Sequence, residues 1–182
     1  MLIGTQTFLR PFVRKDIALY RRWMEDSSTV AALYGAPILH YKAQIEAAYL
    51  DFLAKPGEML LLMIETKEGK RPVGLCFVKN IHPVHRYAEL EQMHIIAECQ
   101  NRGLGKDALG AVLHYLFLEM NLNRVWLITH AGNLKAIGLY LSLGFIKEGL
   151  LRQVHFRGGS YQDAVIMAVL REDWLNLQES SQ

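Results

Sequence analysis

Apolar and polar positions change their period several times along the 182 residues, which predicts alternating strands and helices. The segment Thr5 to Arg10 is short and β-prone, and Pro11 ends it because proline has no amide hydrogen to give to a strand ladder. Asp16 is the predicted N-cap of a helix whose apolar positions are Ile17, Tyr20, Trp23 and Met24. A second helical pattern begins near Ala43 and is expected to stop at Pro56-Gly57.

The pattern then turns to short apolar runs that are typical of buried strands. Met59 to Glu65 and Val73 to Ile81 are such runs, and the sequence Lys67-Glu68-Gly69-Lys70 between them has turn composition. A further extended segment covers about Arg86 to Ile96. Three consecutive antiparallel strands are the simplest account, because sequential strands usually pair.

The following third of the chain alternates between helix and strand. Leu104 to Met120 has the longest helical spacing, and Val125 to Thr129 is a compact apolar strand. Asn133 is a predicted N-cap of a helix that should end at Gly144, since glycine adopts the left-handed C-cap conformation at little cost.

The last part predicts a hairpin and a polar tail. The strands are Phe145 to Phe156 and Tyr161 to Leu170, and Gly158-Gly159 supplies the positive φ angles of a tight turn. Trp174 to Gln182 is polar and is expected to fray. With no repeats and no linker, residues 1–182 are expected to form one mixed α/β domain.

Composition and charge narrow the choice of function. A content of 51% hydrophobic and 21% charged residues is that of an ordinary globular protein. Twenty Lys and Arg against eighteen Asp and Glu leave no broad basic surface, so nucleic acid is not an expected partner. No apolar run approaches the ~20 residues that span a bilayer and no secretory signal opens the chain, so we expect a cytoplasmic protein without a membrane partner. Cys76 and Cys99 have no metal-ligand spacing and are expected to be apolar core residues; no metal is expected.

The stretch Gln100-Asn101-Arg102-Gly103-Leu104-Gly105 lies where the third strand should give way to the long helix. Glycines there allow a ligand close to the backbone, and the free amides of a first helical turn attract a pyrophosphate. The plainer interpretation is a tight strand-to-helix turn. A dinucleotide site is disfavoured because no acidic residue follows the next strand, and a nucleotide triphosphate P-loop because Asp107 follows Lys106.

Asn133 and Tyr140 form the second candidate element. They are seven residues apart and therefore lie within about 20° of one another on a helix surface. One helix face could then hold a cofactor with its cap and present a phenol further along. Taken singly, Asn133 is most simply an N-cap and Tyr140 a core aromatic residue.

Together these stretches resemble the GNAT N-acetyltransferase superfamily, in the branch of bacterial ribosomal-protein and spermidine acetyltransferases. Gln100 to Gly105 is similar to the family's Gln/Arg-x-x-Gly-x-Gly/Ala loop, and Asn133 to Phe145 to its Asn-x-x-Ala-x-x-x-Tyr-x-x-x-Gly-Phe segment. The resemblance extends from Leu9-Arg10-Pro11 to the closing hairpin. It implies a mixed, mostly antiparallel twisted sheet of about seven strands flanked by helices.

The resemblance also implies acetyl-CoA as co-substrate and a direct transfer to an amine. Amides of the loop would hold the pyrophosphate, Asn133 the pantetheine arm, and Tyr140 would protonate the departing thiolate. The strand before the loop would pair with pantetheine and carry a bulge near Leu90 to His94. The expected cofactor contacts are His94, Ile95, Ile96, Gln100, Arg102, Gly103, Leu104, Gly105, Lys106, Asn133, Ala136 and Tyr140.

The general base and the acceptor stay open at this point. Glu89, Glu91 and His94 on the central strand are candidate bases, although a strand glutamate is more often a solvated residue. His82 and His85 could line the acceptor entrance or simply occupy a surface turn. A small amine such as a polyamine, diamine or amino sugar is the first hypothesis, a peptide N-terminus the second, and a non-catalytic acyl-CoA-binding module the alternative of another class. Relatives pair through their closing strands, so a homodimer is possible.

The acids that could attract a cationic acceptor are few in the N-terminal half of the chain, and helix surfaces normally carry such residues. The candidate set is Glu25, Asp26, Glu46 and Asp51.

Overall fold

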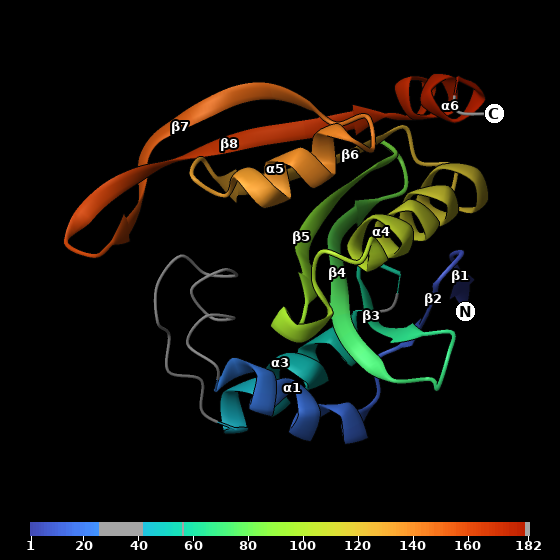
Figure 1. Ribbon diagram of the computed structural model, residues 1–182, viewed down its shortest axis with the longest axis vertical. Coiled ribbons are helices and arrows are strands. Elements are labelled where there is room, and N and C mark those ends of the chain that lie inside the picture. Colours follow the sequence, from blue (N-terminus) through green and yellow to red (C-terminus); the bar gives the residue numbers. More distant parts are fainter. Residues whose placement is uncertain (26–41, 56, 181–182) are drawn as a thin grey trace.

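The computed structural model describes residues 1–25, 42–55 and 57–180. Eight strands form one sheet in the order β1-β2-β3-β4-β5-β6-β8-β7, and helices cover both of its faces (Figure 1). The strands are β1 (Leu2–Ile3), β2 (Thr7–Pro11), β3 (Leu60–Thr66), β4 (Pro72–His82), β5 (Tyr87–Ile95), β6 (Arg124–His130), β7 (Ile146–Arg157) and β8 (Ser160–Leu170). The helices are η1 (Arg14–Asp16), α1 (Ile17–Met24), α3 (Lys42–Ala54), η2 (Ala97–Cys99), α4 (Leu104–His114), η3 (Tyr115–Glu119), α5 (Leu134–Leu141) and α6 (Arg171–Glu179).

The expected mixed, mostly antiparallel sheet is confirmed. β3, β4 and β5 form the predicted antiparallel run, and the one parallel pair joins β5 to β6. The extra strand relative to the expected seven is β1, whose two residues pair with Leu9 and Phe8 of β2. Such a short segment gives no periodic signal in a sequence.

β5 and β6 stay together for only a short distance. Their register covers Tyr87 to Glu89 against Arg124 to Trp126, after which β6 continues to His130 beside β8 alone. In Figure 1 the two strands separate beyond this point, with the start of α4 and α5 near the opening. The sheet is therefore split at its centre.

The two faces of the sheet carry different packing. Leu62 and Ile64 of β3 belong to the large core cluster that includes α4 and α5, whereas Met63 between them packs with α1 and α3. Successive strand residues point to opposite faces, so a continuous apolar run is required here. This explains the uninterrupted Met59 to Ile64 pattern of the sequence.

The predicted long helix is present but changes its form near the end. α4 passes into a π-helical segment, η3, over Tyr115–Glu119. Leu109, Leu113 and Leu116 are fully buried on the face turned to the sheet. The helical spacing read from the sequence is thus the packing face, while the change of hydrogen-bond pattern has no counterpart in the spacing.

Asp16 does not cap α1 with its side chain, contrary to the prediction. Its carboxylate accepts hydrogen bonds from Arg10 Nη1 at 2.7 Å, Arg10 Nη2 at 2.8 Å and the Val13 amide at 2.9 Å. Arg10 also donates to Glu65 on β3 at 2.7 Å. A bidentate guanidinium outcompetes a helix amide for the carboxylate, and the result is a largely buried ion network that joins β2, η1 and β3.

The prediction that the C-terminal tail frays is wrong for the residues described. Arg171–Glu179 form helix α6, and Trp174 is 5% exposed. Its ring lies 5.6 Å from that of Phe117 and 6.2 Å from that of His114. Trp174, with Leu175 packed against the core beside it, docks an otherwise polar helix, because a buried aromatic side chain removes about 150–250 Å² of surface from water.

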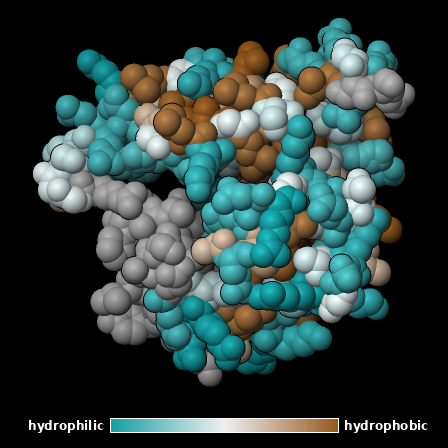
Figure 2. Space-filling model, in the orientation of Figure 1, coloured by the Kyte–Doolittle hydropathy of each residue, from teal (hydrophilic) through white to brown (hydrophobic). Residues whose placement is uncertain are grey.

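The closing hairpin forms as expected around Gly158 and Gly159, whose φ angles are +56° and +81°. Figure 2 shows apolar side chains gathered on the part of the surface where α5 and the β7–β8 hairpin lie. Exposed members of this surface are Leu134, Leu141, Ile146 and Leu150. Among the described helices, none combines the length and apolar character that a bilayer span requires.

Candidate functional site

The gap between β5 and β6 opens into a cleft of about 520 Å³, which we call the α4–α5 cleft. It is bounded by the end of β5, the loop before α4 and the first turns of α4 and α5. The residues that line it are Met93, His94, Ile95, Ala97, Cys99, Gln100, Asn101, Gly103, Leu104, Gly105, Lys106, Asn133, Lys135, Ala136 and Leu139.

The N-terminus of α4 is open toward this cleft. Gly103 is the N-cap with φ +79°, and no side chain caps the helix. The first amides of a helix lack intrahelical acceptors and carry a partial positive charge. Lys106 and Lys135 add full positive charges at the wall of the cleft. The cleft is therefore suited to a polyanion such as a pyrophosphate.

Asp107 would oppose an anion there, but its carboxylate is turned away. It accepts hydrogen bonds from the amides of Thr5 at 2.6 Å, Gln6 at 2.9 Å and Thr7 at 2.8 Å, and from the Thr7 hydroxyl at 2.6 Å. Partial burial of Asp107 raises its pKa, but these hydrogen bonds outweigh burial and hold the pKa below its ordinary value. Hydrogen bonds from the turn before β2 thus compensate the negative charge of Asp107 and anchor the first turn of α4.

The loop is also tied to the end of β5. The Gln100 amide group donates from Nε2 to the Ile95 carbonyl at 2.8 Å, so this predicted cofactor contact has a structural role as well. Beyond Glu89, no described strand pairs with the edge of β5 that faces β6. An extended ligand arm can add to such an edge as a further strand would.

The start of α5 confirms Asn133 as an N-cap, with its Oδ1 accepting from the Ala136 amide at 3.3 Å. His130 at the end of β6 accepts from the Gly132 amide through Nδ1 at 3.0 Å, and its Nε2 is hydrogen-bonded to Gln162. These contacts hold the turn between β6 and α5, which places Asn133 on the wall of the cleft.

Tyr140 lies deeper than the sequence predicted. It is 8% exposed, packs against Phe145 at 5.5 Å between ring centroids, and is absent from the residues lining the cleft. Burial, and secondarily the neighbouring Cys76 thiol, raise the pKa of Tyr140 well above its ordinary value. The phenol is consequently protonated at neutral pH. Cys76 itself is an inert core thiol, since burial raises its pKa to about 12.

β5 bulges at Glu91, within the range predicted for an irregularity. Phe77 of β4 faces Gln92 and Val78 faces Leu90, which leaves Glu91 as the extra residue. Both candidate glutamates meet one lysine: Lys79 Nζ lies 2.5 Å from Glu91 Oε2 and 3.4 Å from Glu89 Oε1. The two carboxylates are therefore on one side of the strand, although each is already partly neutralised.

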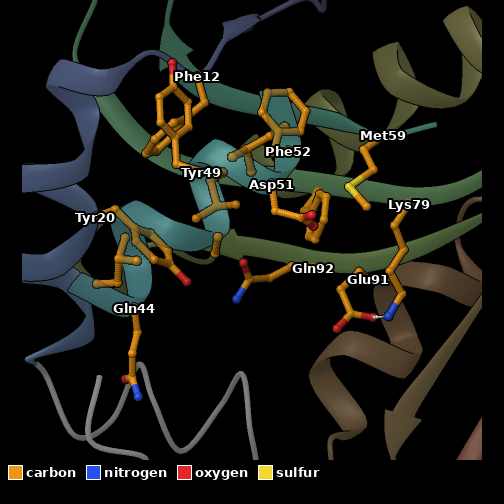
Figure 3. Close-up of a pocket in the computed structure, with 15 residues that line it drawn as sticks. Phe12, Tyr20, Gln44, Tyr49, Asp51, Phe52, Met59, Lys79, Glu91 and Gln92 are labelled. Carbon is orange, nitrogen blue, oxygen red and sulfur yellow. Dashed lines mark ion pairs between the residues drawn. The ribbon is translucent and has the colours of Figure 1, made fainter. Parts of the chain in front are cut away.

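On the α1 and α3 side of the sheet lies a second cavity of about 440 Å³, the α1–α3 pocket (Figure 3). Aromatic rings from Phe12, which follows β2, and from α1, α3 and β4 form much of its wall, and Asp51, Lys79 and Glu91 are its charged members. The residues that line it are Phe12, Tyr20, Gln44, Ile45, Ala48, Tyr49, Asp51, Phe52, Met59, Leu61, Leu75, Phe77, Lys79, Glu91 and Gln92.

The two cavities are lined by successive stretches of β5. Glu91 and Gln92 line the α1–α3 pocket, and the next residues, Met93 to Ile95, line the α4–α5 cleft. Because the bulge lies at this change, a ligand that follows β5 from the cleft reaches the α1–α3 pocket at Glu91. The geometry suits two substrates that approach one strand from opposite sides.

Most of the predicted cofactor contacts come together in the cleft, and some predicted residues do not. Ile96 and Arg102 are outside its lining, as are Tyr140 and Glu89. Residues missed by the sequence reasoning are Met93, Ala97, Cys99, Asn101, Lys135 and Leu139. Leu139 follows Ala136 by three positions on α5, so helical spacing could have predicted it.

His82 and His85 line neither described cavity. Their rings stack at 4.4 Å between centroids, and His82 lies 5.2 Å from Tyr87. His82 ends β4 and His85 lies in the turn between β4 and β5, so the alternative that they simply occupy a surface turn stays open. Of the predicted acids, Asp51 lines the α1–α3 pocket, whereas Asp26 lies outside the described residues.

Within the described part of the chain, no three His, Cys, Asp or Glu side chains are grouped to hold a metal ion.

Comparison with protein families matches residues 6–146 of the chain to the acetyltransferase (GNAT) domain. The chain belongs to the GNAT acetyltransferase family. It is an acetyl-CoA-dependent N-acetyltransferase, and the catalytic class expected from the sequence is confirmed.

Individual relatives match over nearly the whole chain. The spermidine N(1)-acetyltransferase of Vibrio cholerae is 27% identical over 97% of this chain and all of its own length. That of Escherichia coli K12 is 30% identical over 92% of this chain and 87% of its own. The putative ribosomal N-acetyltransferase YdaF of Bacillus subtilis is 30% identical over 56% of this chain and 55% of its own.

A solved structure supports the same fold. The crystal structure of spermidine N-acetyltransferase from Vibrio cholerae in complex with CoA and spermine matches with a TM-score of 0.86 at 27% identity, covering 95% of this chain and all of that one. The mixed sheet split at its centre is therefore the GNAT fold.

Proposed function

We propose that this acetyltransferase transfers the acetyl group of acetyl-CoA to a primary amino group of a small aliphatic amine, with polyamines as the acceptor class. The observation that carries the proposal is that the linings of the two cavities follow one another along β5, next to its bulge. The α4–α5 cleft supplies an anion-binding helix terminus, and the α1–α3 pocket supplies apolar walls with carboxylates.

The α4–α5 cleft is proposed to hold CoA. The amides of Leu104 to Lys106 would bind its pyrophosphate, with Lys106 and Lys135 adding charge. Asn133 would lie beside the pantetheine arm, and the unpaired edge of β5 would bind that arm through its backbone. This places the thioester near the bulge at Glu91, since the arm runs along β5 from the cleft.

The reaction requires proton removal from an ammonium and proton delivery to a thiolate. The amine nitrogen forms a bond to the acetyl carbonyl carbon, the C–S bond breaks, and CoA leaves as a thiol once protonated. Tyr140 is the proposed proton donor. Burial keeps its phenol protonated. No described residue accepts a hydrogen bond from its hydroxyl, so the proton can be donated to the thiolate.

Glu91 is the preferred base among the three candidates. It stands at the bulge and lines the α1–α3 pocket, whereas Glu89 is 9% exposed and accepts from Asn80 Nδ2 at 2.8 Å. His94 lines the cofactor side and contacts the ring of Trp23. A base must reach the ammonium directly or through one water, and Glu91 meets that condition best.

The acceptor class is proposed from the relatives together with the pocket. Both nearly full-length relatives are spermidine acetyltransferases. The α1–α3 pocket has an apolar length between Asp51 and Glu91 that suits an alkyl chain bearing amines. The partial match to YdaF keeps a peptide N-terminus as the second candidate.

Thiol release from acetyl-CoA tests the proposal directly. The purified protein should release thiol with spermidine, spermine or diaminoalkanes, and mass spectrometry should find one added acetyl group on the amine. Amino sugars and a peptide with a free N-terminus provide the competing arms. Turnover with peptides alone would replace the acceptor class, and no turnover with any amine despite CoA binding would refute the proposed reaction.

A further inference from the structure

We propose that Lys79 is a specificity-determining residue that limits the positive charge an acceptor can carry into the α1–α3 pocket. This inference rests on the proposed function, because it treats that pocket as the acceptor site. Lys79 lies on β4 and places an ammonium group of the chain itself where an acceptor ammonium would bind.

The contacts of Lys79 are those of a bound amine. Its Nζ is 2.5 Å from Glu91 Oε2 and 3.4 Å from Glu89 Oε1, and its side chain is 28% exposed. Figure 3 shows Lys79 and Glu91 facing one another at one end of the pocket. Burial lowers the pKa of Lys79, but the hydrogen bonds and charges of Glu91 and Glu89 outweigh it and raise the pKa above its ordinary value. The side chain is therefore charged at neutral pH.

The other carboxylate of the pocket is also paired within the chain. Asp51 Oδ2 lies 2.8 Å from Lys55 Nζ, one turn along α3. Among the described residues lining the pocket, every carboxylate thus has a lysine partner, and the remaining wall is mostly apolar or aromatic. Among the described lining residues, an entering polycation must therefore share each carboxylate with a lysine of the chain.

Lys79 should repel each additional ammonium that an acceptor brings near Glu91. Two unit charges some 6 Å apart interact by about 1–3 kcal/mol when the effective dielectric constant is roughly 20–40, which corresponds to about tenfold or more in binding. The reacting amine avoids this cost once it is neutral, whereas further ammonium groups do not. We therefore expect the wild-type pocket to prefer amines with one charge and an apolar body. This preference should be stronger than comparison with spermidine acetyltransferases alone would suggest.

The test compares acceptors of similar length and different charge. Hexylamine, 1,6-diaminohexane and spermidine carry one, two and three charges, and kcat/KM is measured for each in wild type, Lys79→Gln and Lys79→Met. Both variants should raise the ratio of spermidine to hexylamine roughly tenfold, and added salt should shrink the effect. Lys79→Arg keeps the charge and should keep the wild-type ratio.

Lys67→Gln is the matched control, because it removes one exposed positive charge from the β3–β4 turn, outside the pocket. Its ratio should stay within about twofold of wild type. CoA affinity, measured by calorimetry, reports the fold of every variant, since Lys79 does not line the α4–α5 cleft. An unchanged ratio in Lys79→Gln and Lys79→Met would overturn the proposal.

The same ratio can be taken from amine dissociation constants in the presence of CoA. This measurement tests Lys79 even without turnover: a shift toward spermidine supports the proposal, and equal shifts in Lys67→Gln and Lys79→Gln contradict it. Absence of turnover with all amines would contradict the proposed function alone.

Discussion

The α4–α5 cleft and the α1–α3 pocket are built in different ways, although they share β5. The cleft consists of two short stretches, Gln100 to Lys106 and Asn133 to Leu139, together with the end of β5. It presents backbone groups at helix starts. The pocket is assembled from side chains on α1, α3, β3, β4 and β5, together with Phe12 after β2. It presents rings and paired charges.

This difference separates what is general in the enzyme from what is particular to it. Backbone amides at a helix start bind phosphate almost regardless of the side chains around them, so a cleft made of them suits a common co-substrate. Side chains decide the size, polarity and charge of a pocket. A change on one side should therefore affect one substrate and spare the other, and the following predictions test that separation.

The largest effect is expected at Tyr140, which is buried beside the cleft and lines neither cavity. Tyr140→Phe should lower turnover by more than about tenfold, because the thiolate loses its proposed proton donor. The dissociation constant of CoA, measured by calorimetry, should change little, since Tyr140 does not line the cleft. Tyr115→Phe removes a phenol from η3 as a control and should leave turnover unchanged. Equal turnover in wild type and Tyr140→Phe would mean that solvent or another group protonates the thiolate.

A smaller and one-sided effect is expected from the cleft. Gly103→Ala forces a side chain onto a φ of +79°, which costs about 1–2 kcal/mol and shifts the first turn of α4. The KM for acetyl-CoA should rise several-fold, while the KM for the amine stays the same.

Gly69→Ala provides the matched control for this variant. Gly69 has a φ of +74° in the β3–β4 turn and open space around it, so it carries a similar backbone cost away from the site. It should lower the thermal midpoint without changing either KM. An equal rise of the KM for acetyl-CoA in both variants would contradict a specific role of Gly103 in the cleft.

The smallest effect on catalysis is expected at Asp107. Substitution there should instead change how the free energy of unfolding depends on pH. Asp107→Asn should destabilise the protein by about 1–2 kcal/mol at pH 7, because the amides of Thr5 to Thr7 lose a charged acceptor. The pKa of Asp107 is lowered on folding from an ordinary value of 3.8. Its contribution is thus complete above that value and is lost as the pH falls through the lowered one.

Denaturant unfolding at pH 7 and at successively lower pH checks this sign. The gap in unfolding free energy between wild type and Asp107→Asn should narrow only below about pH 4. Asp173→Asn removes an exposed carboxylate from the first turn of α6 and should show a much smaller gap. A gap at Asp107 that does not depend on pH would contradict the role given to its charge.

The order of most elements could be predicted because most of them show a clear local periodicity. The β3–β4 and β7–β8 hairpins, α5 with its Asn133 cap, and the packing face of α4 followed from spacing and turn residues. The errors came where a tertiary side-chain contact outweighed local preference. Arg10 draws the Asp16 carboxylate from its cap position, and Trp174 docks a helix that looks like a polar tail.

The site divides in the same way. Gln100, Gly103 and Asn133 could be predicted to share a cleft because each stands at a turn between a strand and a helix. The depth of Tyr140 could not, since helical spacing gives an angle and says nothing of how far the sheet covers that face. Asp107, next to the loop before α4, is a signal present in the sequence. An acid at this position must find hydrogen-bond donors elsewhere, and the amides of Thr5 to Thr7 supply them.

Apart from the catalytic class, which a family resemblance indicated, the sequence by itself determined the alternation of strands and helices and the two turns that line the α4–α5 cleft. These properties depend on residues close together in the chain, where spacing and glycine or asparagine chemistry act directly. Only the tertiary structure decided where β5 parts from β6, which rings surround the α1–α3 pocket and which lysine neutralises Glu91. Those features arise from contacts between distant segments, and the pairing of Lys79 with Glu91 depends on a strand register that local pattern does not specify.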